Sequence, residues 1–269
     1  MPRLISAPFF GGHPVFRRAE YAAAVGRDSR DKVVSAMLAQ HLKAGNIKRV
    51  AREVFAAVPK PADPRNWPVD RFLGASRLRT DCIVAYHSAL ELHGYAYTVW
   101  QGWVVVIAPG EPCVYEANGF ACRFVRPGRA IVRNNAIADG ITTIDRLGLE
   151  VRVTTLERTI ADLFDRPDLA TGAEEFFNSL DLVERVDTGA LVRHAKTREN
   201  ATAAGALGFW LECERERLAV PSGALEELRT LAPNDPRYAL GARPGKGKTI
   251  RGWNVILPAE IVERRFEDA

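Results

Sequence analysis

Positively charged side chains are concentrated near the N-terminus of this 269-residue sequence. Residues 1–60 contain 11 Lys and Arg against 4 Asp and Glu, a net charge of +7, whereas the other 209 residues contain 26 and 29, a net charge of −3. Nine of those eleven cations lie between Arg17 and Arg52. Arg can pair with guanine through two hydrogen bonds, and both Arg and Lys pair with phosphate. A basic segment beside a slightly acidic remainder therefore predicts a polyanionic partner for that segment.

Two helices would position most of these cations. Residues 27–30 form the predicted turn between them, where Gly26 suits the left-handed conformation that ends the first helix. Asp28 or Ser29 would cap the second helix, which spans about residues 30–44. Its apolar side chains recur at helical spacing and predict one buried stripe. That stripe comprises Val33, Val34, Met37, Leu38 and Leu42.

A basic hairpin follows the second helix. Gly45 and Asn46 would stop the helix, and residues 47–55 would form two short strands that carry three cations. This order of elements is typical of a winged helix-turn-helix. In that fold the second helix enters the major groove of DNA, and the hairpin, or wing, lies along the backbone. The alternative is a small helical domain with an ordinary solvated cationic face.

The predicted DNA contacts fall into two groups. Arg30, Lys32 and Ser35 lie on the exposed early face of the second helix, where we expect contacts with base edges or the groove. Cations of the hairpin and of the first helix should contact phosphates, which position the protein without specifying a sequence. The full predicted DNA-binding set is Arg17, Arg18, Arg27, Ser29, Arg30, Lys32, Ser35, Gln40, Lys48, Arg49 and Arg52.

A second segment could in principle bind phosphate. Residues 242–249, ARPGKGKT, fit a relaxed phosphate-binding loop with Ala in place of the first Gly. Such a loop needs a strand before it and a helix that begins at its Lys-Thr pair. Residues 250–257 resemble a strand instead, so we expect a flexible basic turn.

Other titratable side chains favour structural roles. His87 and His93 are six residues apart and face different sides of one helix, so we expect core packing for the first and a helix-end role for the second. Arg158 and Asp162 are four apart on a predicted helix and should pair. We therefore predict no catalytic residue, no metal site and no cofactor.

Composition limits the cellular setting. The four cysteines are widely spaced, without the C-x2-C pattern of metal or redox sites, so we expect reduced and mostly buried thiols. No apolar run approaches the eighteen residues of a membrane span, and the N-terminus is a poor signal peptide. We expect a cytoplasmic protein without a membrane partner.

The remaining chain indicates an α+β body. Residues 59–68, PKPADPRNWP, contain four prolines and suggest a boundary. We predict a winged helix-turn-helix over 1–60, a Pro-rich linker over 61–68, and an α+β effector domain with a helical C-terminal part over 69–269. The expected elements are helices at 69–78 and 81–93, a strand at 98–109, a hairpin at 113–127 around Asn118-Gly119, strands at 141–143 and 149–153, a helix at 156–164 with a capping box of Thr154 and Glu157, mostly helix over 170–232, a strand at 249–257 and a helix at 258–266.

Several segments resemble the AbiEi-type antitoxins, which are transcriptional regulators of bacterial type IV toxin–antitoxin systems. The most specific match is VTTLERTIADL at 153–163. The others are GNIKRVAREVF at 45–55, SALELHG at 88–94, LGFWLE at 207–212 and GWN at 252–254. Order and spacing agree over about residues 15–260.

Two features depart from the family pattern. Glu53 and Phe55 stand where the family's wing usually has Gly and then Tyr. Residues 1–13 are poor material for the family's first helix, because they contain Pro8 and two glycines. The first element is therefore left open between a helix, a strand that pairs with the wing, and no element.

The resemblance implies a function. It implies double-stranded DNA as a partner, bound at inverted repeats upstream of the protein's own operon, with repression of that operon. It also implies that the larger domain counteracts a nucleotidyltransferase-like toxin, directly or indirectly, without catalysis. The alternatives are a stand-alone transcriptional regulator, a nucleotide-dependent enzyme that processes nucleic acid, and an interaction module whose basic domain only confers solubility.

Overall fold

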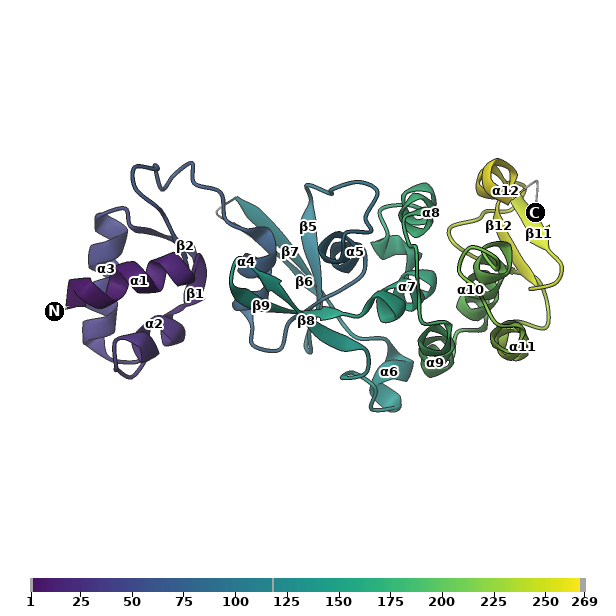
Figure 1. Ribbon diagram of the computed structural model, residues 1–269, viewed down its shortest axis with the longest axis horizontal. Helices are drawn as coiled ribbons and strands as arrows, with labels where there is room; N and C mark the ends of the chain where they lie inside the picture. The colour runs from purple at the N-terminus through teal and green to yellow at the C-terminus, as the bar shows by residue number, and fades with distance from the viewer. Residues whose placement is uncertain (1, 118, 267–269) are drawn as a thin grey trace. The chain divides into compact units, whose positions relative to one another are not determined.

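The structure is a computed structural model that describes residues 2–117 and 119–266 (Figure 1). The chain forms two compact units. Unit 1 comprises residues 1–84, 102–126 and 143–153, and unit 2 comprises residues 85–101, 127–142 and 154–269. The stretch predicted as a linker, residues 61–68, lies inside unit 1.

The N-terminal part of unit 1 is a winged domain of three helices and three strands (Figure 1). Its antiparallel sheet has the order β1-β3-β2, so that β2 and β3 form the wing and β1 completes the sheet. The elements are α1 (Pro2–Gly12), β1 (Val15–Arg17), α2 (Arg18–Ala24), α3 (Lys32–Lys43), β2 (Ile47–Ala51) and β3 (Val54–Ala57). The predicted winged helix-turn-helix is confirmed.

The first element is a helix followed by a strand. Phe9 of α1 is buried and packs edge-to-face on Phe16 of β1, with ring centroids 5.1 Å apart, and on Tyr21 of α2 at 5.4 Å. Phe16 in turn stacks on Phe55 of the wing. This aromatic core stabilises α1 although Pro8 cannot donate a helical hydrogen bond. Tertiary packing therefore overrides the weak local sequence.

The second helix of the motif differs from its prediction at its N-terminus. Gly26 has φ +67°, as predicted. The cap is Asp31, however, because its carboxylate accepts from the Val33 amide at 2.8 Å, and α3 begins two residues later than expected. Val34 and Leu38 are buried, but the prediction for Val33 is wrong: it is 43% exposed. It lies about 100° around the helix from Val34, away from the core.

A six-stranded mixed sheet follows, mostly in unit 1, in the order β6-β7-β5-β4-β9-β8. Strand β5 runs parallel to β7 and antiparallel to β4, and β4 runs parallel to β9. The elements are α4 (Arg71–Leu78), β4 (Ile83–Val84), β5 (Trp103–Ile107), β6 (Cys113–Ala117), β7 (Phe120–Val125), β8 (Ile141–Arg146) and β9 (Leu149–Thr154).

One prediction for this sheet is wrong and another is confirmed in part. Residues 83–84 were expected in a helix but form β4, because this segment pairs with β5 and β9 and its β-branched side chains are buried. The hairpin at 113–127 is confirmed in its strands. Its predicted turn falls partly on Asn118, which lies outside the described residues, while Gly119 has φ +85°.

The other elements are mainly helices of unit 2, as predicted. They are α5 (His87–His93), α6 (Arg129–Arg133), α7 (Leu156–Asp165), a 3-10 turn (Pro167–Leu169), α8 (Ala173–Asp181), α9 (Thr188–Arg198), α10 (Ala201–Cys213), α11 (Ser222–Leu231), β10 (Arg237–Tyr238), β11 (Gly247–Ile250), β12 (Val255–Pro258) and α12 (Ala259–Phe266). The cap of α7 is Thr155, one residue after the predicted Thr154.

The C-terminal strands form a second small sheet, in the order β10-β12-β11. The strand predicted over 249–257 is in fact two antiparallel strands, β11 and β12, joined by a turn. Trp253 of that turn is buried against α10, where a Cβ at Gly208 would overlap its ring. Glycine at 208 is therefore required by this close approach.

Candidate nucleic-acid interface

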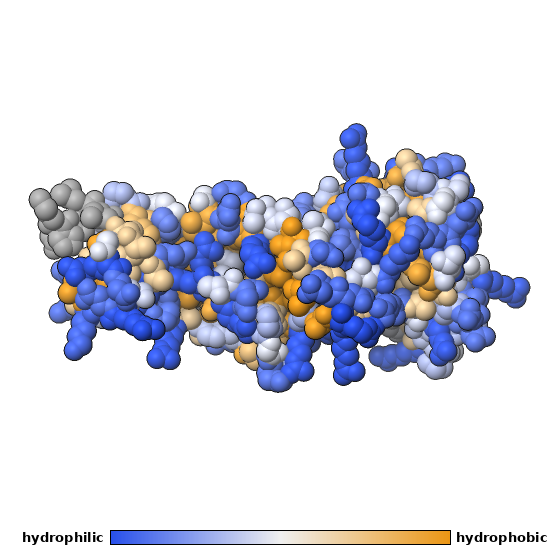
Figure 2. Space-filling view, turned by 90° about the horizontal axis from the view of Figure 1, so that it is seen from below, coloured by the Kyte–Doolittle hydropathy of each residue, from blue (hydrophilic) through white to orange (hydrophobic). Residues whose placement is uncertain are grey.

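The turn before α3 and the first turns of α3 present an exposed face with two cations; Arg30, predicted on the helix, lies in that turn. Arg30 and Lys32, the two predicted base-contacting cations, are exposed, as is Ser35. Strongly hydrophilic side chains stand out from the winged domain in the space-filling view (Figure 2). Val33 and Ala36 are exposed among them. Apolar side chains in this position suit the methyl group of thymine. Val33 is not among the predicted contacts because its helical spacing places it in the predicted buried stripe.

Arg18 fixes the turn before α3. Its guanidinium donates to the carbonyl oxygens of Ser29 and Asp31 and, at 2.7 Å, to the hydroxyl of Ser35. Arg27 pairs with the carboxylate of Asp31 at 2.8 Å. The Val33 amide and then Arg27 lower the pKa of Asp31, so the cap of α3 remains ionised. These bonds hold the helix start in place, which is what precise base contacts require.

Arg17 does not belong to the exposed face. Its guanidinium donates to the carbonyl oxygens of Ser76, Arg77 and Arg79 at 3.0, 2.8 and 2.5 Å, at the C-terminal end of α4. Burial lowers the pKa of this guanidinium. Its donors already serve helix carbonyls that would otherwise lack partners, so we correct its predicted phosphate contact to a structural role.

The wing keeps two exposed cations. Arg49 lies over the ring of Phe55, 5.2 Å from its centroid, and donates to the carbonyl of Arg52 at 3.0 Å. Arg52 is exposed near the hairpin turn. Lys48 instead donates to the carbonyl of Trp67 at 2.5 Å, and burial lowers its pKa. Arg49 and Arg52 therefore lie where a wing contacts a DNA backbone.

A basic cleft of about 650 Å³ adjoins β2. It is lined by Lys48 and Arg49 on the wing, by Arg65 and Trp67 on the segment after it, and by residues around them. None of the described residues that line this cleft is acidic. Arg65 was not among the predicted contacts because its Pro-rich surroundings indicated a linker.

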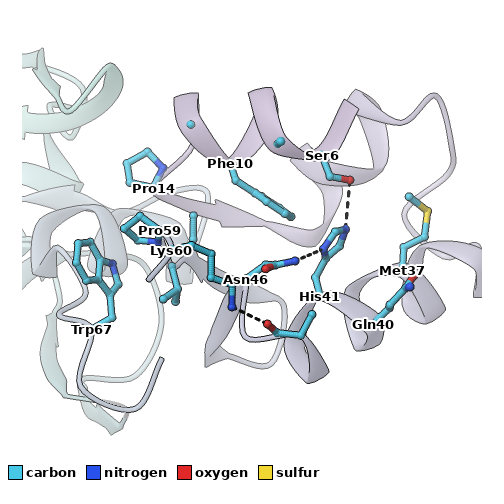
Figure 3. A pocket seen from close by; sticks show the side chains of 15 residues that line it. Ser6, Phe10, Pro14, Met37, Gln40, His41, Asn46, Pro59, Lys60 and Trp67 are labelled. Carbon is cyan, nitrogen blue, oxygen red and sulfur yellow. Dashed lines mark hydrogen bonds between the residues drawn. The ribbon is translucent and has the colours of Figure 1, made fainter. Parts of the chain in front are cut away.

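Gln40 occupies a different location from the other predicted contacts. It lies in the C-terminal half of α3 and lines a separate pocket between α1 and α3 (Figure 3). Recognition helices of this class contact bases mainly through their N-terminal residues. We therefore leave Gln40 out of the DNA contacts that we propose below.

In unit 2, the contacts of the residues considered as candidate sites fit structural roles. His87 is fully buried between Glu91 and Glu175, and His93 donates to the carbonyl of Thr154 at 2.7 Å. Lys248 lies in strand β11 rather than at the start of a helix, so the geometry of a phosphate-binding loop is absent there. Among the described residues, no three His, Cys, Asp or Glu side chains converge as metal ligands would.

The cysteines follow their prediction in part. The structure has all four as free thiols, with Cys82 and Cys122 buried, Cys213 half-buried and Cys113 exposed. Burial raises the pKa of Cys82 to about 11. A buried thiol that stays protonated is a poor nucleophile.

The fold and its exposed basic face thus define a winged helix-turn-helix protein with a larger α+β body. No family model matches the sequence, and no curated protein matches it. The crystal structure of the RV2827C protein from Mycobacterium tuberculosis is similar to this chain, with a TM-score of 0.59 and 12% sequence identity. The match covers 97% of this chain and 92% of that one. At this identity the likeness establishes the shared fold alone.

Within the described residues, no helix is both long and apolar enough to cross a bilayer.

Proposed function

We propose that this protein is a DNA-binding antitoxin that represses its own operon. The observation that carries this proposal is the exposed face formed by Arg30 in the turn before α3 and by Lys32 and Ser35 at its start, held in place by Arg18 and Asp31. The exposed wing cations Arg49 and Arg52 and the net charge of the N-terminal segment support it. The face would enter the major groove, and the wing would follow the phosphates.

A matched set of substitutions tests this assignment. Arg30→Ala should reduce discrimination between the protein's own promoter and a scrambled duplex by about 1–3 kcal/mol, the value of one bidentate base contact. Arg49→Ala should weaken binding to both duplexes about equally, because phosphate contacts carry no sequence information. Arg251→Ala, which removes an exposed charge from unit 2, is the control. If neither Arg30→Ala nor Arg49→Ala changed an electrophoretic shift of the promoter, the assignment would be wrong.

We further propose that unit 2 counteracts a nucleotidyltransferase-like toxin without catalysis of its own. The support is the family resemblance of residues 153–163, which end β9 and continue into α7, and of residues 207–212 in α10; all but Val153 belong to unit 2. Expression of a nucleotidyltransferase-like toxin, encoded next to this gene, should arrest growth, and co-expression of this protein should restore it. Arg30→Ala should also restore it, because that side chain serves DNA binding. If neither the wild-type protein nor Arg30→Ala restored growth, the result would favour a stand-alone regulator.

A further inference from the structure

The pocket between α1 and α3 has the size of a small-molecule site (Figure 3). Its volume is about 780 Å³, and sites for small ligands typically measure roughly 300–1,000 Å³. Its walls come from α1, from the C-terminal half of α3, from the residues that follow α3, and from residues 57–67. All of these segments belong to unit 1.

The walls are suited to an aromatic molecule. Phe10 projects from α1 into the pocket, Met37 lines it from α3, and Trp67 lies at its far end (Figure 3). Flat aromatic rings pack well against other rings, and methionine adapts its shape to a ligand. These three side chains come from different segments, so a bound ring would contact several segments at once.

One cation of the pocket, Lys60, would favour a ligand with a negative charge. Among the described residues that line the pocket, Lys60 is the only Lys or Arg, and none is acidic. Its ammonium donates to the carbonyl of Ala44 at 2.8 Å and, more weakly, to that of Gly45 at 3.5 Å. An ammonium has three donors, so the two carbonyls fix its position and leave a donor for an anion.

Three polar residues of the pocket, Ser6, His41 and Asn46, already form hydrogen bonds with one another. His41 bonds with the Ser6 hydroxyl through Nε2 at 3.2 Å and with the Asn46 amide nitrogen through Nδ1 at 3.3 Å. An amide nitrogen only donates, so Nδ1 accepts and Nε2 carries the proton that is donated to Ser6. Both ring nitrogens of His41 therefore have hydrogen-bond partners, and Lys60 is the cation that we expect to select the charge of a ligand.

We propose that this pocket binds a flat aromatic molecule with one negative charge, with its ring against Phe10 and its anionic group at Lys60. Binding itself does not depend on the proposed function. The consequence for DNA does depend on it: a ligand that contacts both α1 and α3 stabilises one placement of the helix that carries Lys32 and Ser35 and follows Arg30. Occupancy would then change the affinity for DNA, because the ligand favours the placement that it binds.

The probe is anilinonaphthalene sulfonate, an aromatic anion whose fluorescence rises in apolar sites, titrated into the full chain. We expect saturable binding of one probe per chain. Lys60→Gln should weaken it about tenfold or more, because a hydrogen bond to a charged group is lost. Ala44→Trp, at the C-cap of α3, should abolish it by filling the pocket. Lys43→Gln, a neighbouring charge change outside the lining, should have no effect, and circular dichroism would establish that each variant is folded.

The uncharged analogue N-phenyl-1-naphthylamine tests the charge separately. It should bind more weakly than the sulfonate and should not respond to Lys60→Gln. Equal probe affinity for wild type, Lys60→Gln and Ala44→Trp would overturn the site. Binding that responds to Ala44→Trp but not to Lys60→Gln would overturn the anionic class of ligand. Neither readout uses DNA, so failure of the proposed function would be seen separately.

Discussion

A single carboxylate lies between two arginines in the interior of unit 2. Asp162 Oδ1 accepts from Arg198 Nη2 at 2.5 Å, and Oδ2 lies 3.5 Å from Arg158 Nε. The three side chains are at most 2% exposed. Arg158 also donates to the carbonyls of Ile137 and Asp139. The predicted pair of Arg158 and Asp162 is thus confirmed as part of a buried triad that joins α7 to α9.

Removal of the carboxylate should be costly. Asp162→Ala leaves two buried guanidiniums without their common counter-ion and should lower the free energy of unfolding by about 3–5 kcal/mol. Glu227→Ala removes an exposed ion pair with Lys196 and should cost less than about 1 kcal/mol. Urea unfolding of both variants measures the difference. Equal, small losses would show that the triad contributes no special stability.

His194 should make the stability of unit 2 depend on pH. Burial, and then the positive charge of Arg198, lower its pKa from 6.5 to about 4. The unfolded chain therefore binds a proton at higher pH than the folded chain does. This contribution to stability is complete above pH 6.5 and is lost as the pH falls toward 4. The urea midpoint should be lower at pH 5 than at pH 7, and His194→Gln should reduce that difference; an undiminished difference in the variant would refute the assignment.

At the scale of elements, the wing acts together with the segment that follows it. Lys48 of β2 donates to the Trp67 carbonyl, and Arg65 lies on the same cleft as Arg49. Asp63 pairs with Arg65 at 2.9 Å and partly offsets its charge. If DNA follows the wing, this segment supplies a further phosphate contact.

Arg65→Ala should therefore reduce the salt dependence of DNA binding. The slope of log affinity against log salt should become shallower by about one, as expected for one lost phosphate contact. Asp63→Asn should raise the affinity, because it releases Arg65 from its partner. Arg126→Ala, which removes another exposed cation of unit 1, is the control. An unchanged slope for Arg65→Ala would exclude the segment from the interface.

Local sequence predicted the elements whose signals are local. Helix α3, the wing and α7 have strong periodicity or caps, and they form close to their predicted bounds. Helix α1 and strand β4 depend on partners distant in sequence, so local propensity left the first element open and misassigned the second. The site shows the same limit: Arg17 is occupied by the carbonyls of α4, and no sequence pattern indicates that contact.

At the scale of the whole molecule, charge is divided between the two units. Unit 1 contains 19 Lys and Arg against 11 Asp and Glu, a net charge of +8, whereas unit 2 contains 18 against 22, a net charge of −4. A polyanion would be attracted to unit 1 and repelled by unit 2. This division of charge supports the proposal that unit 1 binds DNA and that unit 2 has a separate role.

The most direct test is the affinity of the full chain for its own promoter and for a scrambled duplex, measured by fluorescence anisotropy at several salt concentrations. The account predicts that affinity falls linearly with log salt for both duplexes, and that the promoter binds about 10³-fold or more tightly than the scrambled duplex. Arg30→Ala should reduce that ratio. Affinity that is independent of salt, or a ratio that is the same for Arg30→Ala and the wild type, would contradict it.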